Sequence, residues 1–83
     1  MKETIHKVIS EALPAATVHV FGDDGEHFGA VVISPDFEGM SLIKQHRLVM
    51  DAMKEELAER VHALQLKTFT PERWETSRQE YNL

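Results

Sequence analysis

The chain has 83 residues, and fourteen Asp and Glu against nine Lys and Arg give it a formal net charge of −5. This length allows one small domain, and its 42% hydrophobic and 28% charged residues are typical of a globular protein. Because cysteine is absent, disulfides, a thiolate nucleophile and cysteine-bound zinc are excluded. The acidic balance argues against a protein that coats nucleic acid by charge, since such binding uses Lys and Arg to neutralise phosphates.

The first part of the sequence predicts a helix followed by a two-stranded hairpin. Apolar residues recur at helical spacing up to Leu13, and Pro14 ends this helix because proline disfavours helical geometry in the preceding residue. Residues 17–21 alternate as a strand with one buried face. The turn at 22–25 joins them to a second strand at 27–34. Apolar residues point to both faces of this second strand, so we expect it to be central or covered on both sides.

The remaining sequence predicts a long helix, a third strand and a final helix. We expect Ser41 to cap a helix over residues 42–60. Four residues form its apolar stripe: Leu42, Val49, Met53 and Leu57. Residues 61–69 alternate as a third strand. Thr70 followed by Pro71 is a typical helix start, because Thr caps the first turn and Pro is favoured at its first position.

The order α-β-β-α-β-α predicts an α+β fold of the size seen in KH-like domains. A hairpin followed by a helical crossover requires a mixed three-stranded sheet, and we expect a right-handed crossover with the helices packed on one face. We predict one domain at residues 1–75 and a polar C-terminal tail at 76–83. No signal-peptide pattern or long apolar segment is present, so we expect a cytoplasmic protein with no membrane association.

Several short stretches, taken in order over residues 3–74, resemble the BolA family. They are His27-Phe28, the VVIS run that ends the second strand, Phe37-Glu38-Gly39, Gln45-His46-Arg47-Leu48-Val49, Val61-His62-Ala63-Leu64, Thr68, Thr70 and Trp74. The chain departs from the family at Gln45, where many members have Arg. Its loop at 22–26 is short and lacks the Cys or extra His of some members, which is similar to a short-loop bacterial branch. The resemblance implies a class II KH-like fold.

The resemblance also implies a partner function without catalysis or a small-molecule substrate. BolA-family proteins pair with monothiol glutaredoxins and share a [2Fe–2S] cluster in iron–sulfur trafficking and iron homeostasis. The glutaredoxin and glutathione supply the thiolates, so this chain alone is expected to bind no cluster. The resemblance makes His46 the chain's own ligand. We assign Met40 and Arg47 to the partner-binding surface, since a flexible Met suits an adaptable contact.

Two histidines are candidate metal ligands, and each has a structural alternative. Neutral imidazole binds iron, and His replaces Cys on one iron of some [2Fe–2S] centres. His46 also lies near the apolar stripe of its helix, where a histidine is more often simply half-buried. His27 is the second candidate, and its alternative is a strand-end residue bonded to the turn.

The other histidines have structural interpretations. We expect His19 to be exposed, His6 to lie away from the apolar face of the first helix, and His62 to be structural. A zinc site built from His27, His46 and His62 is disfavoured, because no two of them have the spacing that places paired ligands on one helix face.

DNA binding is the alternative function, because some BolA-family members are described as transcription regulators of the stress response. Lys44, Arg47 and Lys54 form its candidate basic face, with Lys67 and Arg73 nearby. The competing interpretation is an ordinary solvated helix face. KH domains clamp nucleic acid with a GXXG loop between helices, but the Gly-Asp-Asp-Gly run at 22–25 lies in the predicted hairpin turn, and its two acids would repel phosphates. No nucleotide-binding or nucleophile-elbow motif appears.

Overall fold

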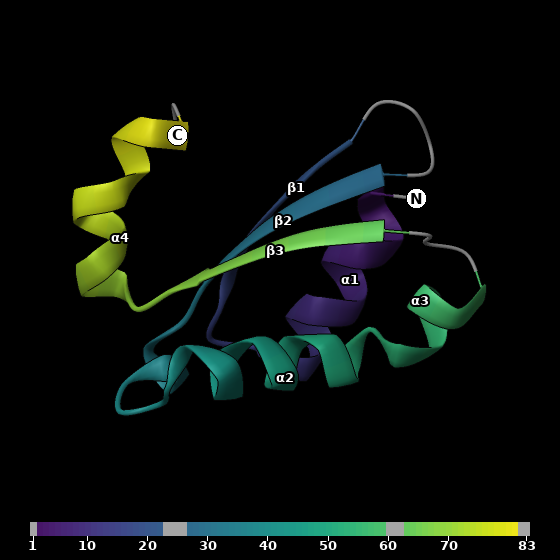
Figure 1. Ribbon diagram of the computed structural model, residues 1–83, viewed down its shortest axis with the longest axis horizontal. Coiled ribbons are helices and arrows are strands. Elements are labelled where there is room, and N and C mark those ends of the chain that lie inside the picture. Colours follow the sequence, from purple (N-terminus) through teal and green to yellow (C-terminus); the bar gives the residue numbers. More distant parts are fainter. Residues whose placement is uncertain (1, 23–26, 60–62, 82–83) are drawn as a thin grey trace.

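Three strands form one mixed sheet with helices on both of its faces (Figure 1). The computed structural model describes residues 2–22, 27–59 and 63–81. In chain order the elements are α1 (Lys2–Ala12), β1 (Thr17–Phe21), β2 (His27–Ile33), the 3-10 turn η1 (Pro35–Phe37), α2 (Leu42–Ala52), α3 (Lys54–Glu59), β3 (Ala63–Phe69), α4 (Pro71–Ser77) and the 3-10 turn η2 (Arg78–Tyr81). The predicted α+β class is confirmed.

The sheet has the order β1-β2-β3, with β2 in the centre as expected. β1 pairs with β2 antiparallel, and His19 lies opposite Val31. β2 pairs with β3 in parallel, and Val31 lies opposite Lys67. Because successive side chains of a strand point to opposite faces, this register divides the sheet residues into two sets.

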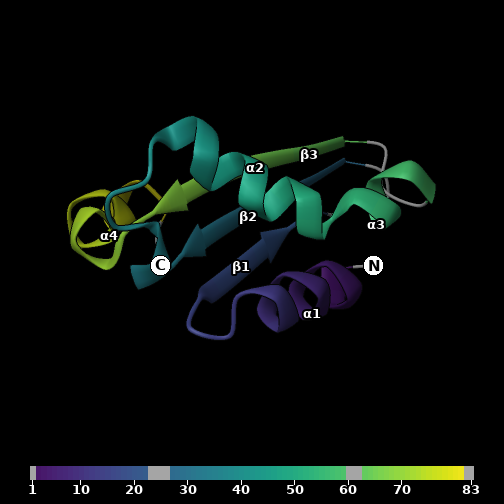
Figure 2. The ribbon, with the colours of Figure 1, turned by 90° about the horizontal axis from the view of Figure 1, so that it is seen from below.

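The first face of the sheet carries the main core under α1 and α2. From the sheet it receives Val18, Phe28, Ala30 and Val32, and from the rest of the chain Ile5, Ile9, Leu13, Phe37, Val49 and Met53. Figure 2 shows α1 and α2 crossing this face side by side. The predicted amphipathic first helix and the predicted Ser41 cap are confirmed: the Ser41 hydroxyl accepts a hydrogen bond of 3.2 Å from the Lys44 backbone N–H.

The second face carries a smaller core under the C-terminal segment, which corrects the prediction that all helices share one face. Val31 and Ile33 of β2 pack there with Trp74 of α4. Phe69 and Tyr81 complete this cluster, which we call the C-terminal aromatic cluster. Apolar residues on both faces of β2 require a cover on each face, and α4 supplies the second one.

The helix predicted over 42–60 is two helices, with a break at Met53. The Met53 backbone N–H shares its hydrogen bond between the regular i−4 carbonyl of Val49 and the i−3 carbonyl of Met50, and its φ of −94° and ψ of 5° depart from α-helical geometry. A straight helix of that length would be about 28 Å long, whereas the seven residues of β3 span about 23 Å. The break lets the chain return to the start of β3 with Met53 fully buried.

Two further details differ from the sequence prediction. Leu42, assigned to the apolar stripe, is 54% exposed, because the inner face of α2 is formed by Gln45 and Val49. The predicted domain boundary at residue 75 falls inside α4, and the segment after it continues through η2 to Tyr81, which packs against Phe69. The described part of the predicted tail therefore contributes to the second core.

Candidate functional site

A buried polar link joins the start of α2 to β3, next to His46. Gln45 and Thr68 are each 4% exposed. The Thr68 hydroxyl donates a hydrogen bond of 2.8 Å to Gln45 Oε1, and Gln45 Nε2 donates one of 2.9 Å to the Met40 carbonyl. In the sequence Gln45 stood out only as a departure from Arg. The structure shows that its amide holds two elements in register, which no periodicity signal reports.

Replacing Gln45 by Leu is expected to lower the free energy of unfolding by about 1–3 kcal/mol, because the buried Thr68 hydroxyl and the partly buried Met40 carbonyl lose their partner. Urea titration followed by Trp fluorescence measures this. Thr68→Val is the matched control, and the double variant Gln45→Leu, Thr68→Val should lose less than the sum of the single losses. Additive losses would contradict the link.

His46 lies on α2 immediately after this link and is half-buried. It lines a hollow of about 270 Å³ together with residues of α2, β3, α4 and η2: Leu42, Lys67, Thr68, Phe69, Arg73, Glu80 and Tyr81. Within the described part of the chain, the His46 ring has no hydrogen bond or ion pair. Its ring nitrogens are therefore chemically available for a metal or a hydrogen bond from outside the chain.

His27 lies at the other end of the sheet, as the exposed first residue of β2. The register places it opposite Ala63 and on the second face of the sheet. It lines a hollow of about 480 Å³ with Phe21, Gly22, Phe28, Gly29 and Gln65. His27 is therefore exposed and lies outside the cluster that α4 forms with Val31 and Ile33 on this face.

The structure does not bring the two predicted ligands together. His27 lies beside Ala63, the first residue of β3, whereas His46 shares a hollow with Thr68 and Phe69 at the end of that strand. Thr68 lies five positions after Ala63, which corresponds to about 17 Å of strand. One [2Fe–2S] cluster is much smaller than this, so it can take at most one of the two histidines.

His62, one member of the disfavoured zinc site, lies outside the described residues. It is covalently joined to Ala63, the register partner of His27. Over residues 2–22, 27–59 and 63–81, no three or more His, Asp or Glu side chains cluster in a way that would hold a metal ion.

His19 corrects the expectation of an exposed side chain. It is half-buried, and its ring stacks on Trp74 with centroids 6.1 Å apart and an interplanar angle of 26°. His6 is exposed on α1, as predicted, with Nδ1 3.5 Å from the Ser10 hydroxyl. His19 is therefore part of the packing of the C-terminal segment.

The two residues assigned to a partner surface differ in burial. Met40 is half-buried and packs against the main core, and its carbonyl accepts the bond from Gln45. Arg47 is exposed on α2. Arg47 is thus accessible to a partner, while Met40 exposes only part of its side chain.

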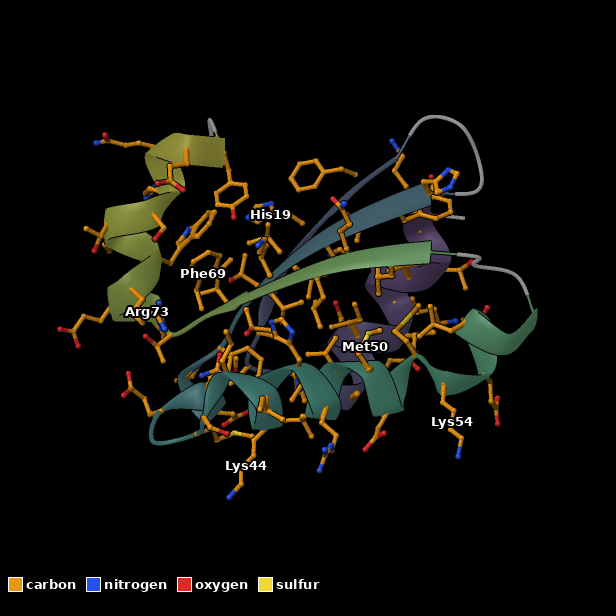
Figure 3. All side chains as sticks on the ribbon, viewed as in Figure 1. His19, Lys44, Met50, Lys54, Phe69 and Arg73 are labelled. Atoms are coloured by element: carbon orange, nitrogen blue, oxygen red, sulfur yellow. The ribbon has the colours of Figure 1, made fainter. Side chains whose placement is uncertain are left out.

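The candidate basic face on α2 and α3 is interrupted by acids. Lys44, Arg47 and Lys54 are exposed, and Figure 3 shows Lys44 and Lys54 pointing away from the sheet. Residues three or four apart share a helix face, so Asp51 follows Arg47 on the same face. Glu55 adjoins Lys54 in the sequence, and both line a hollow with Asp51. The three cations therefore do not form an uninterrupted phosphate-binding stripe.

Lys67 and Arg73 lie apart from this face, near His46. Both are exposed and line the 270 Å³ hollow.

In the described ranges there is no helix long and apolar enough to span a bilayer.

These features define a small α+β domain in which a mixed three-stranded sheet is covered by α1 and α2 on one face and by α4 on part of the other. The family model of BolA-like proteins matches residues 2–73. The chain belongs to the BolA family, and the resemblance inferred from its motifs is confirmed.

Relatives and solved structures agree with this assignment. The chain is 37% identical over 75 residues to acid stress protein IbaG of Escherichia coli K12, covering 89% of this chain and 88% of that protein. A BolA homologue from Coxiella burnetii matches with a TM-score of 0.80 and 39% identity, over 90% of this chain and 96% of that one. The BolA domain of SufE1 from Arabidopsis thaliana matches with a TM-score of 0.74 and 30% identity, over 87% and 93%.

Proposed function

We propose that this protein is a non-catalytic partner of a monothiol glutaredoxin, with which it holds or transfers a [2Fe–2S] cluster in iron–sulfur trafficking. The observation that carries the proposal is the BolA family match over residues 2–73. A relative named SufE-like protein 1 contains a BolA domain of the same fold, and another is named an acid stress protein, which is consistent with a role in iron–sulfur chemistry or stress.

The absence of cysteine sets what this chain contributes to such a cluster. With no thiolate of its own, it offers nitrogen or oxygen, and imidazole suits iron better than a carboxylate does. His46 is the first candidate because its half-buried ring has no partner among the described residues. The alternative is the opposite end of the sheet, where His27 lies beside Ala63 and His62 precedes Ala63 in the chain.

Co-purification with a monothiol glutaredoxin and glutathione under anaerobic conditions tests the proposal. Iron content and the visible absorption and circular dichroism spectra are measured for the wild type and for His46→Ala, His27→Ala and His62→Ala. The expected result is a heterodimer with bound iron and a spectrum distinct from that of the glutaredoxin alone. Failure to form any iron-containing heterodimer would overturn the proposed function.

The three variants locate the ligand separately. If His46 is the ligand, His46→Ala alone restores the spectrum of the glutaredoxin. If only His62→Ala or His27→Ala does so, that histidine is the ligand and the assignment to His46 is wrong. His6→Ala is the matched control, since His6 is exposed on α1 and belongs to neither end of the sheet described above.

DNA binding through Lys44, Arg47 and Lys54 is the alternative proposal, supported only by three exposed cations on α2 and α3. The salt dependence of the binding affinity distinguishes it from the glutaredoxin proposal, because affinity that depends on phosphate contacts falls steeply as salt rises. Gel-shift titrations at low and physiological salt, with Lys44→Gln and Lys54→Gln together, test it. Affinity that these substitutions leave unchanged would exclude this face.

A further inference from the structure

The outer edge of β3 is open in the described part of the chain. β3 is seven residues long, pairs with β2 on one side, and ends the sheet. Figure 2 shows it at the border of the sheet, with no described strand beyond it. An unpaired edge presents backbone N–H and C=O groups to an added strand. Proline, which blocks such pairing, is absent from β3, and Lys67 is its only charged residue.

Apolar surface accompanies this edge. Leu64 and Leu66 point to the first face, since they pair with Phe28 and Ala30, yet both are only half-buried. At the start of α2, Leu42 and Ile43 are 54% and 69% exposed. The side chains of a strand added beside β3 would extend the first face of the sheet and cover the exposed parts of Leu64 and Leu66.

Positively charged side chains lie near the C-terminal end of this β3 edge. Lys67 of β3 and Arg73 of α4 are exposed and line the 270 Å³ hollow. Neither forms an ion pair with another described residue. Glu80 lines the hollow too, so the charged lining holds two cations against one acid, in a chain whose net charge is −5. An arriving carboxylate therefore meets a local field opposite in sign to the chain as a whole.

We propose that the β3 edge binds an extended acidic peptide segment of a partner protein. The peptide backbone pairs with the outer edge of β3, its apolar side chains cover Leu64 and Leu66, and a carboxylate lies beside Lys67 and Arg73. A second copy of this chain fits the edge less well, because it brings a further charge of −5 and the same cations. This inference needs no iron and no glutaredoxin, so it stands or falls apart from the proposed function.

Fluorescence anisotropy with a labelled eight-residue peptide of alternating Val and Glu tests the proposal, in low salt without iron or glutathione. The double variant Lys67→Gln, Arg73→Gln is expected to weaken binding about tenfold. The matched control Lys2→Gln, Lys7→Gln removes the same charge from exposed positions on α1 and should change the affinity less than about twofold. Equal losses in the two variants would show a nonspecific charge effect and overturn the proposal.

The wild-type chain provides an independent test of the backbone pairing. A peptide N-methylated at every residue has no backbone N–H left to donate to the β3 edge, so it should not bind. Amide chemical-shift changes caused by the unmodified peptide should concentrate in β3. Equal binding of the methylated peptide, no binding of the unmodified one, or shift changes that arise instead from self-association of the chain would each overturn the proposal.

Discussion

Replacing Trp74 by Ala is expected to lower the free energy of unfolding by about 3–5 kcal/mol. Trp74 is 8% exposed and packs with Val31 and Ile33 against the second face of the sheet. Its ring lies 5.2 Å from that of Phe69 and 5.6 Å from that of Tyr81. A domain of 83 residues has a small stability margin, so this loss is expected to leave a substantial unfolded fraction at 37 °C.

Urea denaturation followed by far-ultraviolet circular dichroism measures this effect, because Trp74 is the only tryptophan and its removal abolishes the fluorescence signal. Tyr81→Ala is the matched control. Tyr81 belongs to the same aromatic cluster but is only half-buried, so a smaller loss is expected. If Trp74→Ala cost no more than a typical surface substitution, the C-terminal segment would not be an integral part of the fold.

Replacing Gly22 by Ala is expected to lower the free energy of unfolding by about 2–3 kcal/mol. Gly22 has a φ of +152°, and an added Cβ would lie 2.6 Å from Phe28 Cδ1 and 2.8 Å from the His27 carbonyl oxygen. The carbonyl belongs to the backbone and cannot rotate away alone, and Phe28 is 4% exposed in the main core. The clash of the added Cβ can therefore be relieved only if the backbone at the start of β2 shifts.

Thermal or urea unfolding measures this loss. Two other glycines, tested in the same assay, separate the cost of the backbone conformation from that of the steric contacts. Gly39 has a φ of +79° with no atom within 4 Å of an added Cβ, so Gly39→Ala should cost only the backbone term of about 1–2 kcal/mol. At Gly29 an added Cβ meets atoms no closer than 3.8 Å, so Gly29→Ala should be close to neutral. Equal losses at Gly22 and Gly39 would show that the steric contacts at Gly22 are unimportant.

Local patterns predicted the elements well because their signals are short-range. The alternation at 17–21 and the two-faced second strand predicted the hairpin and the central place of β2. The Thr70-Pro71 pair predicted the start of α4, where the Thr70 hydroxyl accepts a 3.3 Å bond from the Arg73 backbone N–H. Each of these features depends on a few residues that are neighbours in the chain, so a short stretch of sequence is enough to predict it.

The stripe assigned to α2 failed for a reason that periodicity does not report. Leu42 has the correct spacing but stays 54% exposed, because Gln45 and Val49 form the inner face of α2. Gln45 is polar but buried, because Thr68 of β3 and the Met40 carbonyl satisfy its amide. Whether a position is buried depends on the partner element, and a polar side chain is buried when that element offers hydrogen bonds.

The sequence by itself determined the order of the elements, the BolA family, and the fact that a chain without cysteine offers a cluster only nitrogen or oxygen. Only the tertiary structure decided that α4 covers the second face and that His27 and His46 lie at opposite ends of β3. The physical reason is that spacing along the chain reports which side chains share one element's face. Distances between elements instead follow from strand register and from the surfaces that helices must cover.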